Sequence, residues 1–147
     1  MLDLDSVTVI IVNYNAGSLL TRCVHAALEQ AQQVIVVDNA SSDSSVLKLE
    51  SEFSLENRLC IIRSESNIGF AAGCNKGLNA ATQPYILFLN PDCMLQSGTL
   101  KHLVQVLASD SNIGMVGGYL TNPDGSEQGG GRRAIPSPWR AFVRAFG

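Results

Sequence analysis

The stretch Leu87-Phe88-Leu89-Asn90-Pro91-Asp92 is an apolar run that ends abruptly in a carboxylate. A second run of this kind, Val34-Ile35-Val36-Val37-Asp38, stands earlier in the chain. Short apolar runs of this length predict buried strands, and each would deliver one acid to its carboxyl end. Ligands of open α/β sheets bind at that edge. The two acids therefore predict a polar site for a charged small molecule, in which a metal ion could take part.

The apolar pattern predicts strands that alternate with helices. Strands are expected at 7–12, 34–37, 59–62, 85–89 and 113–120. Apolar side chains at three- and four-residue steps predict helices at 17–31, 46–53, 70–81 and 100–107. This order predicts an α/β fold, with a mostly parallel sheet, right-handed crossovers and helices on both faces.

Length and composition favour one globular domain. The chain has 147 residues, of which 46% are hydrophobic and 16% charged, enough to bury a core. No apolar stretch approaches the roughly 18 residues of a membrane span. Residues 1–122 are assigned to the α/β core, and residues 123–147 to a turn, a flexible glycine- and arginine-rich segment and an amphipathic C-terminal helix.

Charge and cysteine usage exclude some partners and compartments. A net charge of −3 predicts no nucleic-acid partner and no whole-chain attraction to anionic membranes. The four cysteines form no C-x-x-C pair, and an acidic N-terminus argues against a secretory signal. We therefore expect reduced thiols and a cytoplasmic location.

Two glycines interrupt the predicted helix 70–81. Gly73 and Gly77 each cost roughly 1 kcal/mol relative to alanine in a helix interior. This cost indicates that something approaches the helix very closely.

Asp38 stands where doubly wound folds commonly bind a nucleotide through the ribose or base. The alternative is that Asp38 caps the following helix, which Ser41, Ser42 or Asp43 could also do. The first strand is followed by Asn13-Tyr14-Asn15-Ala16-Gly17 and not by G-x-G-x-x-G, which disfavours a dinucleotide-binding domain.

Asn90 and Asp92 place an amide oxygen and a carboxylate on alternate residues. Both oxygens could reach one hard cation that bridges two phosphates, and Mg²⁺ or Mn²⁺ would suit them. The alternative is a simple turn, in which Pro91 stops the strand and Asp92 accepts a local backbone N–H.

Four segments, at 9–15, 36–43, 67–77 and 87–92, resemble motifs of the inverting glycosyltransferases of the GT-A fold. The resemblance is to the rhamnosyltransferase-like branch of family 2 and covers about residues 7–138. It implies a GT-A fold, a nucleotide-diphosphate-sugar donor and a divalent metal, with an acceptor hydroxyl displacing the nucleotide in one step.

The resemblance also implies roles for individual residues. Asp38 would contact the base or ribose, and Asp92 with Asn90 would bind the metal, Asn90 replacing the first acid of the family's D-x-D. The remaining donor-site residues would be Asn13, Asn15, Asn67, Gly69 and Asn75. Apart from the resemblance, the chemistry of arginine suggests that Arg132 and Arg133 clamp the diphosphate; the alternative is a solvated charge pair.

An inverting transferase needs a general base, which this family supplies from an acidic motif downstream of the metal site. The acids after Asp92 are Asp110, Asp124 and Glu127, and none lies in such a motif. The expectation is therefore the N-terminal, donor-binding portion of a longer enzyme, incomplete at its C-terminus, with the catalytic residue unassigned.

The segment 138–146 places Trp139, Phe142, Val143 and Phe146 on one helical face beside Arg140 and Arg144. Such a face could dock on a membrane surface near a lipid-linked acceptor, or pack against the rest of a larger domain. Either way an exposed apolar patch predicts self-association, as a homo-oligomer.

The first hypothesis is a metal-assisted glycosyltransferase that acts on a glycan or lipid-linked acceptor in polysaccharide assembly, at the cytoplasmic face of a membrane, with rhamnose as a candidate sugar. The second is a non-catalytic module that binds a nucleotide or nucleotide-sugar. The third is a response-regulator-like or other doubly wound signalling domain, whose acids would cluster around a phosphoacceptor.

Overall fold

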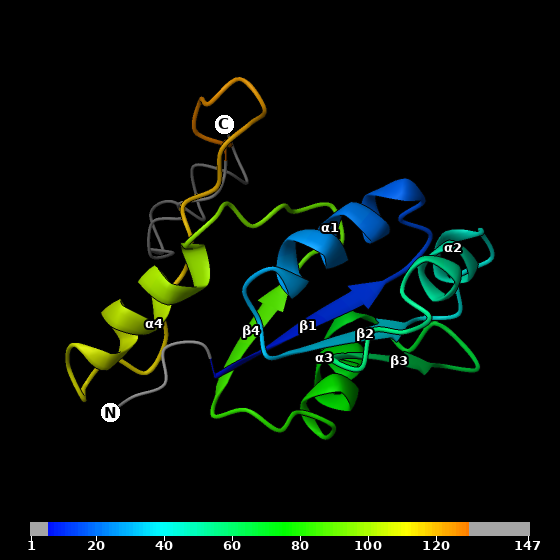
Figure 1. Cartoon of the computed structure of the whole chain (residues 1–147), viewed down its shortest axis with the longest axis horizontal. Coiled ribbons are helices and arrows are strands. Elements are labelled where there is room, and N and C mark those ends of the chain that lie inside the picture. Colours follow the sequence, from blue (N-terminus) through cyan, green and yellow to red (C-terminus); the bar gives the residue numbers. More distant parts are fainter. Residues whose placement is uncertain (1–5, 130–147) are drawn as a thin grey trace, which may run out of the picture. The chain divides into compact units, whose positions relative to one another are not determined.

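The structure is a computed structural model, and it describes residues 6–129 (Figure 1). Its elements are β1 (Val7–Asn13), α1 (Ser18–Leu28), β2 (Gln33–Asp38), α2 (Ser45–Glu52), β3 (Leu59–Arg63), α3 (Phe70–Leu78), β4 (Tyr85–Leu89) and α4 (Thr99–Ala108). The chain divides between Val116 and Gly117 into two compact units. In the second unit, a turn at 122–125 lies within a bridge between Thr121 and Glu127.

The four strands form one parallel sheet in the order β3-β2-β1-β4, which confirms the predicted parallel α/β class. The chain adds β2 and β3 on one side of β1 and then returns to place β4 on the other side. Response regulators instead flank their first strand with the second and third. The strand order therefore rules out the response-regulator form of the third hypothesis, and it places the topological switch point beside β1.

Helices cover both faces of the sheet, as predicted (Figure 1). The core on one face joins apolar side chains of α1 and α2 to inward residues of the central strands, including Leu20, Val24, Leu49, Val9, Ile11 and Val36. A smaller cluster of Ile10, Ile35 and Val37 lies on the opposite face, where α3 packs. Because β1 is sandwiched in this way, all seven of its residues are buried.

The glycines of α3 explain how closely that helix approaches the sheet. A Cβ atom added at Gly77 would lie 2.5 Å from Ile10 Cγ2, and one added at Gly73 would lie 2.8 Å from Val12 Cγ1. Real Cβ atoms do not approach other atoms so closely. The predicted close approach is confirmed, and the partner is the sheet itself.

The fifth predicted strand is wrong, because residues 113–120 form no strand. Three of these eight residues are glycines, which weaken a strand and offer no side chain to pack. Met115 is 88% exposed and Tyr119 is 58% exposed. The segment therefore gains little burial that would offset the entropy of an extended chain.

Two helices are shorter than predicted, because α1 ends at Leu28 and α3 at Leu78. The amide of Gln30 bonds to the Ala27 carbonyl, and that of Ala81 to the Leu78 carbonyl. These three-residue bonds tighten the last turn and end each helix.

Candidate functional site

Asn13 and Asp38 are the last residues of β1 and β2 and are partners in the register of the sheet. Asn13 Nδ2 lies 3.0 Å from Asp38 Oδ1. Both side chains are buried, and Asp38 keeps 4% exposure. The predicted polar edge therefore begins as a hydrogen-bonded pair inside the core, next to the switch point.

The Asn13 amide is the centre of a small polar network. Its Nδ2 also lies 3.0 Å from Ser41 Oγ and 3.0 Å from Ser45 Oγ, so two N–H groups serve three acceptors. Its Oδ1 is buried and has no hydrogen-bond partner among the described residues. A buried acceptor of this kind favours a donor from outside the chain, such as water or a ligand N–H or O–H.

Asn15 ties the loop after β1 to the loop after β2. Its backbone lies in the left-handed region at φ 54°. Asn15 Oδ1 accepts the Ser42 amide at 2.8 Å and the Asp43 amide at 3.2 Å. The Asn15 side-chain oxygen therefore stabilises the contact between the two loops. Asn15 has this structural role as well as being a candidate ligand-binding residue.

Asp43 makes the reciprocal connection. It accepts hydrogen bonds from the Ser45 hydroxyl and amide through Oδ1, and from the Gly17 amide through Oδ2. The Ser45 hydroxyl, followed by these amides, lowers the pKa of the Asp43 carboxyl. Because Asp43, and not Asp38, accepts the amide of the first residue of α2, the capping alternative for Asp38 is wrong.

Asn67 and Gly69 precede α3 and are held by a buried asparagine of the β2–α2 loop. Asn39 Nδ2 donates to Asn67 Oδ1 at 3.0 Å, and the Ile68 amide donates to Asn39 Oδ1 at 3.1 Å. Asn67 Oδ1 also accepts the Gly69 amide at 2.9 Å, where Gly69 has φ 82°. These bonds bring the start of α3 to the edge that carries Asp38.

Asn90 and Asp92 lie on a turn that directly follows β4. The Cys93 amide closes the turn by donating to the Asn90 carbonyl at 3.1 Å. Both candidate metal-binding side chains are exposed. Because β4 pairs in parallel with β1, this turn leaves the same edge of the sheet as Asn13.

A buried cysteine of α1 contacts this turn. The Cys23 thiol donates to the Asn90 carbonyl oxygen at 3.4 Å. Burial, followed by the nearby Cys93 and Asp92, raises the pKa of Cys23 to about 12, so it is a thiol and not a thiolate at neutral pH.

The turn provides one carboxylate and one amide oxygen to a cation. Within residues 6–129, no three His, Cys, Asp or Glu side chains gather to form a cation cage. This donor set fits Mg²⁺ or Mn²⁺ ions that take most of their ligands from phosphate oxygens and water.

The other predicted site residues are less constrained. Asn75 is an exposed residue of α3. Arg132, Arg133 and the predicted C-terminal helix at 138–146 lie outside the described residues.

Sequence reasoning missed several residues of this edge. Ser45, Asn39 and Arg63 were not singled out, although Asn39 adjoins Asp38 and Arg63 ends β3 opposite it in the register. The Arg63 guanidinium pairs with Glu50 at 2.8 Å. In the sequence, only the acids that follow the apolar runs indicated the site. Contacts between loops could not be predicted, because they leave no periodic pattern in the sequence.

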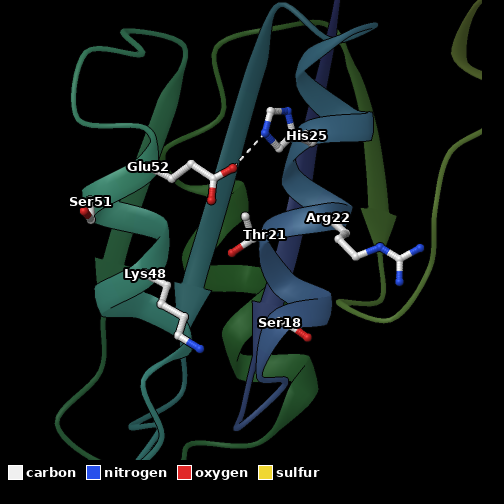
Figure 2. Close-up of a pocket in the computed structure, with 7 residues that line it drawn as sticks. All are labelled: Ser18, Thr21, Arg22, His25, Lys48, Ser51 and Glu52. Atoms are coloured by element: carbon white, nitrogen blue, oxygen red, sulfur yellow. Dashed lines mark hydrogen bonds and ion pairs between the residues drawn. The ribbon is translucent and has the colours of Figure 1, made fainter.

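A separate groove of about 560 Å³ runs between α1 and α2 (Figure 2). His25 of α1 and Glu52 of α2 meet across it at 2.8 Å (Figure 2). The groove is lined by Ser18, Thr21, Arg22, His25, Lys48, Ser51 and Glu52. None of these is a predicted site residue, so the groove is distinct from the polar strand edge.

None of the helices within residues 6–129 has the length and apolar character needed to cross a lipid bilayer.

Comparison with solved structures supports the same architecture. The mannosyltransferase PcManGT from Pyrobaculum calidifontis, solved with GDP-Man and Mn²⁺, is 26% identical with a TM-score of 0.63, over 71% of this chain and 32% of that one. S. aureus TarS 1-349, solved with UDP-GlcNAc, is 24% identical with a TM-score of 0.62, over 70% of this chain and 31% of that one. The GT-A-like fold is therefore confirmed over about 70% of the chain.

Curated relatives are similar at the level of sequence. Glycosyltransferase GlyG of Streptococcus pneumoniae is 28% identical over 78% of this chain and 39% of its own length. The Bacillus subtilis protein TuaG, described as a putative teichuronic acid biosynthesis glycosyltransferase, is 29% identical over 82% of this chain and 49% of its own. The chain thus spans less than half the length of these relatives.

The model of the family described as "Glycosyl transferase family 2" matches residues 8–145, nearly the whole chain. This match covers the four strands, except for the first residue of β1, and the four helices, together with the Asn13–Asp38 pair and the Asn90–Asp92 turn. The chain belongs to glycosyl transferase family 2.

Proposed function

We propose that this chain forms the donor-binding part of a glycosyltransferase that takes its sugar from a nucleotide-diphosphate-sugar with the help of Mg²⁺ or Mn²⁺. The observation that carries the proposal is the shared edge of three adjacent parallel strands. Asn13 ends β1 with Asp38 of β2 on one side, and the Asn90–Asp92 turn follows β4 on the other.

The roles proposed for these residues follow from the burial of their side chains. Asp38 and Asn13 are buried, which suits recognition of a base or ribose by hydrogen bonds. The unpartnered Asn13 Oδ1 offers one more acceptor for a ligand donor. Asp92 and Asn90 are exposed, which suits an ion shared with phosphate oxygens.

A metal ion held by Asp92 and Asn90 would neutralise charge on the donor diphosphate and on the leaving nucleotide. Asn67 and Gly69, fixed by Asn39, would line the donor site at the start of α3. PcManGT supports this assignment, because that relative was solved with GDP-Man and Mn²⁺.

Finer features of the activity remain proposals. A rhamnosyl donor and the rhamnosyltransferase-like branch rest on the motif resemblance, and neither GlyG, TuaG nor PcManGT is named as a rhamnosyltransferase. A glycan or lipid-linked acceptor, polysaccharide assembly and a cytoplasmic location at the membrane's inner face are proposed on the same basis. Peripheral membrane contact, self-association and a diphosphate clamp by Arg132 and Arg133 also stay predictions.

The test is calorimetric titration with UDP, dTDP and GDP, each with and without Mn²⁺. We expect one nucleotide to bind in a metal-dependent manner, and Asp38→Ala and Asp92→Ala to weaken that binding. Asp110→Ala is the matched control, because this acid follows α4 and its carboxylate hydrogen-bonds only Asn112 among the contacts described.

Asp92 is exposed, so its variant reports on binding even where Asp38→Ala fails to fold. Metal-independent binding by a folded Asp92→Ala variant at wild-type affinity would contradict the proposal. Donor hydrolysis or sugar transfer by the chain would exclude the rival hypothesis of a non-catalytic binding module.

A further inference from the structure

The turn that carries Asn90 and Asp92 is anchored to α1 through a single oxygen atom. The Asn90 carbonyl accepts the Cys93 amide at 3.1 Å, which closes the turn, and the Cys23 thiol at 3.4 Å. Cys23 is completely buried, so its position is set by the core and not by solvent. The turn is thereby linked to the buried core of the fold.

The far end of the same connection is also anchored to the α1 side. Gln30, just after α1, donates from Nε2 to the Gln96 carbonyl at 3.0 Å. Its Oε1 accepts the Leu100 amide at 3.2 Å. The connection between β4 and α4 is therefore held at both ends, with Asp92 exposed between the two anchors.

We propose that Cys23 is a positioning residue for the candidate metal site, because its thiol holds the Asn90 carbonyl and thereby the turn that presents Asn90 and Asp92. This inference rests on the proposed function, in which those two side chains bind Mg²⁺ or Mn²⁺. Cys23 itself touches neither metal nor donor.

The physical reason is that metal affinity is sensitive to displacement of the ligand side chains. A site with one carboxylate and one amide oxygen has few ligands, so small shifts in the turn change the metal affinity directly. Removing the thiol leaves the Asn90 carbonyl with the Cys93 amide only, and that bond moves with the turn. Partners that orient metal ligands typically contribute about 10- to 100-fold in metal affinity.

A packing role for Cys23 would have a different signature. Cys23 belongs to the core cluster with Leu20 and Val24, so any substitution also changes packing. Cys23→Val keeps an apolar side chain of similar size and removes the S–H donor, whereas Cys23→Ala removes both. Cys74, a buried thiol of α3, allows the same two substitutions without a contact to the turn.

The experiment compares Cys23→Val and Cys23→Ala with Cys74→Val and Cys74→Ala in two measurements. The first is Mn²⁺ affinity in the presence of saturating nucleotide, together with nucleotide affinity without metal. The second is hydrogen exchange of the Cys93 amide, which needs no ligand. We expect both Cys23 variants to lose about tenfold in Mn²⁺ affinity and to lose protection at Cys93, with metal-free nucleotide affinity unchanged.

The Cys74 variants are expected to keep wild-type Mn²⁺ affinity and Cys93 protection, even where they unfold at lower denaturant. Unchanged Mn²⁺ affinity and exchange in a folded Cys23→Val protein would overturn the inference, as would equal losses in the Cys74 variants. If the wild-type protein shows no Mn²⁺-dependent binding, the proposed function fails. The exchange measurement then still decides whether Cys23 holds the turn.

Discussion

Asn13 and Asp38 meet at the ends of two central strands, with Asn13 Nδ2 3.0 Å from Asp38 Oδ1. Asn13 is completely buried and Asp38 is 4% exposed, so an unpaired carboxylate here would be costly. The neutral Asn13 amide donates to Asp38 Oδ1, and the Ser41 backbone amide donates to Asp38 Oδ2 at 3.4 Å, so both carboxylate oxygens have a donor. The strand edge is thus both part of the core and the place where the candidate ligand site begins.

Asn13→Ala is expected to lower the free energy of unfolding by about 1–3 kcal/mol at pH 7, because it leaves the buried Asp38 oxygen without its donor. Urea denaturation followed by circular dichroism measures the loss. Asn79→Ala is the control, since that exposed residue follows α3 and should change stability by less than about 0.5 kcal/mol. Equal effects of the two substitutions would contradict the network.

Gly77→Ala is expected to destabilise the fold by about 1–3 kcal/mol, although alanine is the better helix former. The added Cβ would lie 2.5 Å from Ile10 Cγ2 and 3.2 Å from Val37 Cγ2. A double-mutant cycle with Ile10→Ala tests the cause. Removing Cγ2 should relieve the overlap, so the double variant should be more stable than the sum of the single effects predicts.

The Asp43 carboxyl is expected to make stability depend on pH in the acid range. Its pKa is lowered in the folded chain, so it contributes stability that is present above its ordinary pKa and lost as pH falls through the lowered value. Asp43→Asn should therefore cost most stability near pH 7 and progressively less below about pH 4. Unfolding curves at several pH values measure this difference, and a constant difference would show that the charge is not responsible.

Asn90→Asp is expected to tighten Mn²⁺ binding in the presence of nucleotide, because it adds a second carboxylate to the exposed turn. Asn90→Ala should weaken it, and the backbone carbonyl held by Cys23 is retained in both variants. Calorimetry with Mn²⁺ gives the order of the three affinities. Identical affinities for all three proteins would remove Asn90 from the metal site.

The sequence by itself determined the alternation of strands and helices, the two acids at strand ends and the close approach at Gly73 and Gly77. These features are local, because a buried parallel strand needs a continuous apolar run and a helix pressed on a sheet needs residues without a Cβ. The prediction of a strand at 113–120 was wrong because strand formation also depends on a non-local partner. An apolar run becomes a strand only with a neighbour to pair with, and no local pattern reports the neighbour.

Only the tertiary structure decided which polar groups meet. Asn13 lies 25 residues from Asp38, and Cys23 lies 67 residues from Asn90, yet each pair is in hydrogen-bond contact. Such contacts follow from the strand order and the helix packing. These depend on many weak interactions spread over the whole core. The sequence specifies the residue types at the strand ends, whereas their placement at one edge of the sheet depends on β1 lying between β2 and β4.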